Sequence, residues 1–266
     1  MEISLLLGVL VGIVLGLTGA GGGILAVPAL VNGMGRSVQE AAPVALIAVA
    51  SGAALGALDG LRKGLVRYKA ALVMVLCGIP FTQAGLAAAQ RLPQPVLLIL
   101  FAGLTLLVVA SLIRQTMQKN GPADNAHALA RIDPTTGRFR WTWGSAGLFA
   151  GFGALTGFMT GLLGVGGGFV IVPAMRRFTN APLHGIVATS LLVIALVSSG
   201  GIAVAVANGA ALPWPATLLF AAATALGMGV GRKLSPRLSE TTIQFGFAVV
   251  LLGSAASMIF KALGNL

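Results

Sequence analysis

The sequence predicts an all-α integral membrane protein made of two homologous helical halves. Of its 266 residues, 57% are hydrophobic and only 9% are charged, whereas a soluble domain carries about 25% charged residues. The hydrophobic residues form long uninterrupted blocks, and one glycine-rich motif occurs twice. We expect about eight hydrophobic segments, since a helix needs roughly 20 residues to cross a bilayer.

The long apolar blocks are the evidence for membrane-spanning helices. None of them contains a charged residue. Backbone polar groups in lipid must be satisfied within the chain, and no alternating barrel pattern is present, so helices are expected. The blocks are Ala41–Leu58, Ala70–Ala89, Val96–Ile113, Gly185–Ala207, Ala216–Val230 and Phe245–Phe260.

The net charge of +11 bears on orientation in the membrane. In a soluble protein this excess would suggest nucleic acid, but here the basic residues lie between apolar blocks, and no aromatic-basic platform accompanies them. The expected partner is therefore the lipid bilayer and not nucleic acid. The sequence leaves a homo-oligomer open.

The sequence does not predict an enzyme or a bound cofactor. No histidine lies within an apolar block to serve a buried nucleophile, and no phosphate-binding loop of an ATPase is present. The single cysteine, Cys77, can form no internal disulfide or multi-cysteine metal site. No His/Cys/Asp/Glu cluster lies among the apolar blocks, which disfavours metal transport.

The repeat divides the chain into residues 1–114, a polar linker at 115–143, and residues 144–266. GLTGAGGGILAVPAL begins at Gly16, and GLLGVGGGFVIVPAM begins at Gly161. Their glycines and their prolines, Pro28 and Pro173, align at one constant offset. Internal repeats of this kind are typical of secondary transporters.

Four basic loops predict how the halves lie in the membrane. The positive-inside rule places such loops in the cytoplasm, and all four can share that side: 62–69, 114–140, 176–177 and 232–237. Segments 3–34 and 144–173 then each begin and end on one side. About 30 residues extend roughly 45 Å as a helix. That length is more than one membrane crossing needs and less than two crossings need. A pair of half-helices turning at the glycines fits, and the halves are then inverted with both termini outside. A plain hydropathy count would instead predict parallel halves.

The glycine motifs are the candidate substrate-binding site. Three consecutive glycines break a helix, and the helix that restarts presents free N–H groups and a positive dipole end, which suit an anion. In an inverted repeat two such breaks can meet near the membrane midplane. The alternative is that the glycines only permit close helix packing. The candidate residues are Gly21, Gly22, Gly23, Gly166, Gly167 and Gly168.

Three polar residues complete the candidate site. The hydroxyls of Thr189 and Ser190 can donate to the oxygens of an anion, or bond to a backbone carbonyl one turn back. Gln83 lies in an apolar block, where an unpaired amide is costly. It is expected to line the path or to link two helices.

The doubled GxGGGxxxxP signature, with TSL at Thr189–Leu191 and a short basic linker, resembles the sulfite exporter TauE/SafE family of bacterial inner-membrane transporters. The resemblance implies a multi-pass inner-membrane protein that exports a small sulfur-containing anion such as sulfite or an organosulfonate. The chain departs from a symmetric site, since Pro43-Val44 stands opposite Thr189-Ser190. The alternative function is an anion channel or a lipid-handling membrane protein of the same fold, because pore and carrier differ in gating rather than in residue type.

Overall fold

The computed structural model of the chain describes residues 2–19, 22–117, 130, 139–210 and 212–264. These residues are almost entirely helical, which confirms the all-α prediction. Seven helices are long and apolar enough to cross a membrane, and two shorter apolar helices lie in the first 34 residues. The elements are α1 Glu2–Thr18, η1 Gly22–Leu25, α2 Ala26–Met34, α3 Val38–Arg62, α4 Tyr68–Arg91, α5 Gln94–Met117, α6 Trp143–Leu163, α7 Gly168–Phe178, α8 Leu183–Ala207, α9 Trp214–Leu234, η3 Ser235–Arg237 and α10 Glu240–Gly264.

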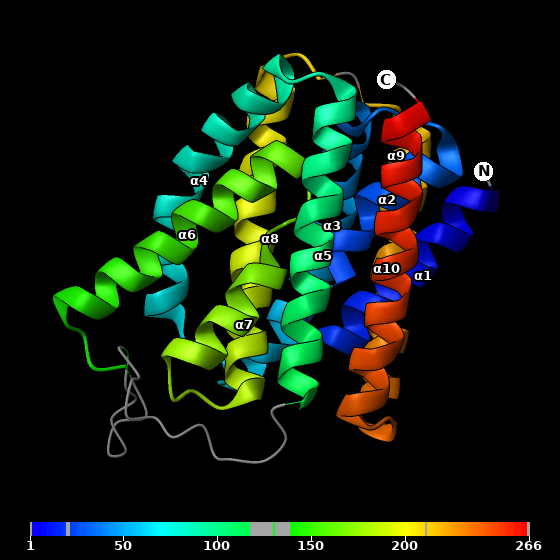
Figure 1. Cartoon of the computed structure of the whole chain (residues 1–266). Coiled ribbons are helices and arrows are strands. Elements are labelled where there is room, and N and C mark those ends of the chain that lie inside the picture. The colour runs from blue at the N-terminus through cyan, green and yellow to red at the C-terminus, as the bar shows by residue number, and fades with distance from the viewer. Residues whose placement is uncertain (1, 20–21, 118–129, 131–138, 211, 265–266) are drawn as a thin grey trace.

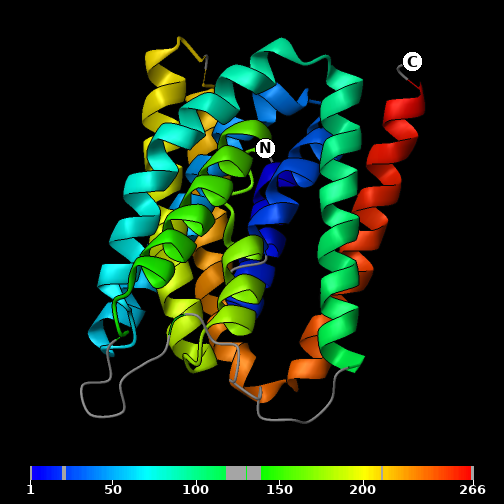
Figure 2. The ribbon, with the colours of Figure 1, turned by 60° about the vertical axis from the view of Figure 1, so that its left-hand side comes forward.

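The two ends of the helical bundle differ. The N- and C-termini lie at one end (Figure 1). The end of α5 and the start of α6, which the linker joins, lie at the other. The turns that join α3 to α4, α7 to α8 and α9 to α10 also lie at the linker end (Figure 2). The basic turns and the linker thus share one end. Their side of the membrane, and the inverted relation of the halves, stay predictions.

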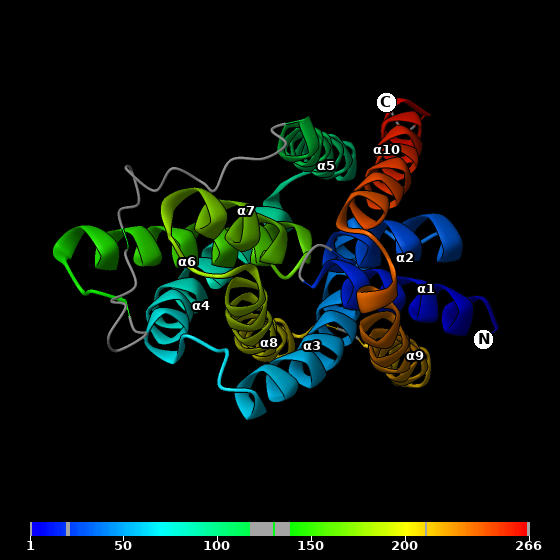
Figure 3. The same ribbon diagram turned by 90° about the horizontal axis from the view of Figure 1, so that it is seen from below.

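The halves exchange helices. The first helix of each half packs against the fourth helix of the other, α1 on α9 and α6 on α4. The equivalent helices α3 and α8 pack on each other, as do α5 and α10. Seen from the linker end, α2 and α7 lie between these two pairs (Figure 3). Neither half therefore folds around a core of its own.

Glycines at four-residue spacing bring the exchanged helices together. A Cβ placed on Gly12 of α1 would lie 2.1 Å from the carbonyl oxygen of Thr224 on α9. At the equivalent place, a Cβ on Gly157 of α6 would lie 2.0 Å from the carbonyl oxygen of Gly78 on α4. Only glycine permits backbones this close, as at the small-residue crossings of membrane helices. The same pattern recurs one turn before and after, at Gly8, Gly16, Gly153 and Gly161.

Candidate functional site at the paired helix breaks

The first glycine motif separates α1 from η1 and α2. Gly19, directly after α1, has a φ of 75°, which glycine adopts without strain. The hydroxyl of Thr18 accepts a hydrogen bond from the amide of Gly22 at 3.1 Å and donates one to the carbonyl of Val14 at 2.8 Å. The predicted helix break is therefore present, and it is stabilised by its own threonine. Gly21 lies outside the described residues.

The second glycine motif makes a sharper break between α6 and α7. Gly164, Gly166 and Gly167 have φ values of 70°, 75° and 69°, and α7 begins at Gly168. Gly167 is the N-cap of α7, and no side chain caps that helix. The first amides of α7 thus face the break with the positive end of the helix dipole.

The two breaks meet in the core. A Cβ on Gly23 would lie 2.7 Å from the carbonyl oxygen of Val165, which belongs to the other break. The side chain of Val49, on α3, lies between them, within 3.2 Å of a Cβ on Gly23 and 2.9 Å of one on Gly166. The halves thus place their glycine motifs next to each other.

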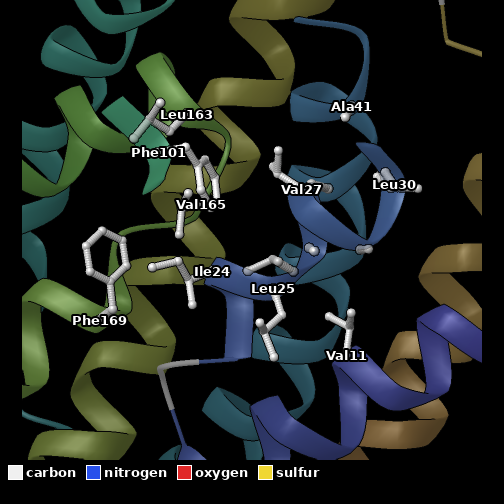
Figure 4. Packing of buried hydrophobic residues seen from close by; sticks show 14 of the residues in the cluster. Val11, Ile24, Leu25, Val27, Leu30, Ala41, Phe101, Leu163, Val165 and Phe169 are labelled. Carbon is white, nitrogen blue, oxygen red and sulfur yellow. The ribbon is translucent and has the colours of Figure 1, made fainter. Parts of the chain in front are cut away.

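The surroundings of this meeting point are apolar. Ile24, Val165 and Phe169 gather where the breaks approach (Figure 4), and none of them is more than 5% exposed. A ligand here would find backbone N–H groups and hydrocarbon. This region would hold an anion weakly.

Close packing accounts for part of the glycine requirement. A Cβ on Gly22 would lie 2.2 Å from the backbone nitrogen of Leu15, and one on Gly167 would lie 2.0 Å from Cγ2 of Thr156. Both contacts are with the helix that precedes the break. Contact between these glycines and a substrate stays a prediction.

Two buried hydroxyls that sequence reasoning missed flank the second break. Thr156 on α6 and Ser198 on α8 are fully buried, and neither hydroxyl has a hydrogen-bond partner among the described residues. A Cβ on Gly167 would lie 2.0 Å from the methyl carbon Cγ2 of Thr156, and one on Gly166 would lie 3.3 Å from Oγ of Ser198. A buried hydroxyl without a partner costs about 1–3 kcal/mol, so native structures seldom keep one without a reason. Their only sequence signal is a polar residue inside an apolar segment.

The polar residues that the sequence predicts for the site make contacts within the protein or lie at its surface. The hydroxyl of Thr189 donates to the carbonyl of Gly185 at 2.7 Å and accepts from the amide of Arg67 at 2.9 Å. The hydroxyl of Ser190 donates to the carbonyl three residues back. Both are satisfied within the protein, and their contact with a substrate stays a prediction. Gln83 is exposed on α4 rather than held between helices.

A cavity of about 640 Å³ opens at the end that carries the termini. We call it the vestibule. Its walls come from the start of α3, the end of α4, the end of α6 and the turn between α8 and α9. Gly161 and Leu162, directly before the second break, line it. Its polar lining residues are Arg36, Gln39, Glu40, Gln90 and Asn208.

At the linker end, α3 and α9 are tied by a cluster of Asp59, Lys63 and Arg232, here called the linker-end cluster. Arg232 donates to the carbonyl of Gly56 at 2.7 Å and pairs with Asp59 at 2.9 Å. Lys63 pairs with the same carboxylate at 2.9 Å, from one turn further along α3. These contacts thus join the two halves at the linker end, opposite the end at which the vestibule opens.

The described residues contain no group of three or more His, Cys, Asp or Glu that could hold a metal ion.

Comparison with known proteins matches the chain to one family of membrane proteins. The sequence profile described as "Sulfite exporter TauE/SafE" matches residues 4–258. A probable membrane transporter protein of Xylella fastidiosa strain Temecula1 is 28% identical, covering 97% of this chain and 95% of its own. The probable membrane transporter proteins YunE and YjnA of Bacillus subtilis are each 25% identical, covering 98% and 97% of this chain and 98% and 100% of their own. No solved structure matches significantly.

Proposed function

The chain belongs to the sulfite exporter TauE/SafE family, and on that premise we propose that it exports a small sulfur-containing anion, sulfite or an organosulfonate. It is a multi-pass bacterial membrane protein of a transporter family rather than an enzyme. The substrate and its site are the proposal.

The meeting of the two glycine breaks carries this proposal. Helix termini with free N–H groups are ready-made anion sites, and discontinuous helices near the midplane hold substrates in many transporters. Here the breaks lie against each other, with Val49 between them. Each helix end offers only about half a unit of positive charge. Such a site releases its anion readily, as an exporter requires.

The difference between the two ends of the bundle supports a carrier. The vestibule reaches Gly161 and Leu162, close to the second break, whereas Arg232 joins α3 to α9 at the linker end. If the basic linker end is cytoplasmic, this conformation opens toward the outside. Export then requires a second conformation, in which the linker-end cluster separates and the vestibule closes.

Transport by inside-out membrane vesicles tests the proposal. Vesicles with the protein should take up radiolabelled sulfite or methanesulfonate faster than vesicles without it, and the rate should saturate with concentration. Counterflow from vesicles preloaded with unlabelled anion should accelerate uptake. Absence of uptake across a panel of sulfur oxyanions would refute the substrate class, and uptake without saturation or counterflow would favour a channel.

A further inference from the structure

We infer that the second glycine break alone holds the anion, and that the hydroxyls of Thr156 and Ser198 are its side-chain ligands. The ligand class is a singly charged sulfur oxyanion, either hydrogen sulfite or an alkyl sulfonate. This inference rests on the proposed function and specifies its site.

The hydroxyls of Thr156 and Ser198 differ from those of other buried threonines in the helical bundle. A buried hydroxyl in a helix is usually satisfied by a carbonyl one turn back. Thr82, Thr160 and Thr224 make that bond at 2.9, 2.7 and 2.8 Å. Within the described part of the chain, the hydroxyls of Thr156 and Ser198 make none. Both remain available as donors to a ligand, directly beside the break.

The first break satisfies its own amide, and the second cannot do so in the same way. In the first break, the hydroxyl of Thr18 accepts from the amide of Gly22. The constant offset of the repeat pairs Thr18 with Leu163 and Gly22 with Gly167. Leucine has no acceptor atom, and no side chain caps α7. The second break therefore keeps donors for an anion that the first break has already used.

The repeat also shows that the fold does not require these hydroxyls. The bounds of α3 and α8 share this offset, so Val44 and Ala45, rather than Pro43 and Val44, stand opposite Thr189 and Ser190. At the same offset, Val11 stands opposite Thr156 and Ala53 opposite Ser198, and both apolar residues are buried. The first half thus places hydrocarbon where the second places two unpaired hydroxyls. A structural role would not explain this difference, whereas a ligand held by only one half would.

The vestibule leads toward the hydroxyls along two helices. Gly161 on α6 and Ala205 on α8 line it. Thr156 and Ser198 lie five and seven residues deeper on those helices, about 8 and 10 Å at 1.5 Å per residue. Both hydroxyls are enclosed in this conformation. An anion reaches them when α6 and α8 part from the vestibule side.

The charge around the break favours one negative charge. No ionisable residue lies on η1 or α6. On α3, α4, α7 and α8, apart from the half-buried thiol of Cys77, the ionisable residues lie in the first or last turns. The carboxylate nearest the break along α3 is that of Glu40, two residues before Ala42, which packs against Gly164. With only the partial charge of a helix end, a doubly charged ion is bound less well than a singly charged one. These terminal residues are Glu40, Asp59, Arg62, Tyr68, Lys69, Arg91, Arg176, Arg177 and His184.

Equilibrium binding of radiolabelled sulfite to the full chain in lipid nanodiscs tests the ligands, at a pH where hydrogen sulfite predominates. Thr156→Val and Ser198→Ala should each weaken binding about tenfold or more, as expected for one hydrogen bond to a charged group. The double variant should bind more weakly than either. Thr217→Val is the control, because that buried hydroxyl bonds to the carbonyl of Pro213, and it should bind like the wild type. The melting temperatures of the Thr156 and Ser198 variants should not fall, since no protein hydrogen bond is lost.

A pH series tests the charge. Sulfite binding should fall as the pH rises and hydrogen sulfite loses its proton, whereas methanesulfonate, which stays singly charged, should bind equally throughout. Wild-type affinity in the double variant would overturn the ligand assignment while leaving the proposed function in place. Equal affinity for sulfite at alkaline pH would overturn the charge assignment. A wild-type protein that binds neither anion would overturn the proposed function as well.

Discussion

Removal of the guanidinium of Arg232 should shift the protein away from the conformation with an open vestibule. Arg232→Met keeps most of the side-chain stem but removes the hydrogen bond to the carbonyl of Gly56 and the ion pair with Asp59. Both bonds join α3 of one half to α9 of the other. They are made in this conformation and would be lost if the linker end opened.

The magnitude follows from the two contacts of Arg232. A hydrogen bond from a charged donor contributes about 1.5–3 kcal/mol. The ion pair joins side chains that are 30% and 38% exposed, so solvent screening limits it to roughly 0–1 kcal/mol. The total, about 1.5–4 kcal/mol, corresponds to a shift of roughly 10- to 700-fold in the equilibrium between conformations.

A cysteine placed at Leu212 in the vestibule reports this shift through its rate of labelling by a membrane-impermeant maleimide. In a background without the native cysteine, Arg232→Met should lower the rate. Lys63→Met is the matched control. It also removes a positive charge that pairs with Asp59, but that ion pair lies at the end of α3 and does not join α3 to α9. Its rate should stay near that of the wild type. An unchanged rate for Arg232→Met, or an equal decrease for Lys63→Met, would refute the role of the linker-end cluster in closing that end.

Three further predictions follow from named contacts. Gly167→Ala should lower the free energy of unfolding in detergent by about 2–5 kcal/mol, because it adds a steric overlap to the strain of a positive φ. Gly35 has a similar φ and open space around it, so Gly35→Ala should be destabilised by the backbone strain alone. Equal losses of stability in the two variants would show that the steric overlap at Gly167 contributes nothing. Thr189→Val should destabilise the protein by about 1–3 kcal/mol by removing an acceptor from a buried amide, and an unchanged melting temperature would contradict this. In intact cells, an impermeant maleimide should label Gly209→Cys but not Gly64→Cys, two exposed sites with the same backbone strain, and the reverse pattern would invert the topology.

The placement of the polar residues shows where inference from the sequence stopped. The sequence predicts a partner or a path-lining role for Gln83, because an unpaired amide in an apolar block is costly. In the structure Gln83 is exposed, and its neighbour Thr82 is buried against α6. In a soluble helix, the alternation of polar and apolar residues identifies the buried face. In a membrane helix both faces are apolar. On α4, the exposed Leu76 and the buried Val75 look alike in the sequence.

The sequence by itself determined the features that depend on local composition and on comparison within the chain. Apolar blocks predict membrane helices because lipid cannot satisfy backbone groups, and the aligned glycines of Gly16–Pro28 and Gly161–Pro173 predict two helix breaks because glycine weakens a helix wherever it occurs. Both predictions agree with the structure.

Only the tertiary structure decided which helices exchange between the halves and which hydroxyls lack a partner. Thr18 and Thr156 are both threonines in apolar helices, yet the hydroxyl of Thr18 caps its own break, whereas that of Thr156 is enclosed with no hydrogen-bond partner among the residues that the structure describes. That difference depends on whether an amide or a carbonyl from another segment lies within hydrogen-bond distance. Packing between distant parts of the chain sets such distances, and in a membrane protein, where the lipid-facing and buried faces are equally apolar, the local sequence carries little record of that packing.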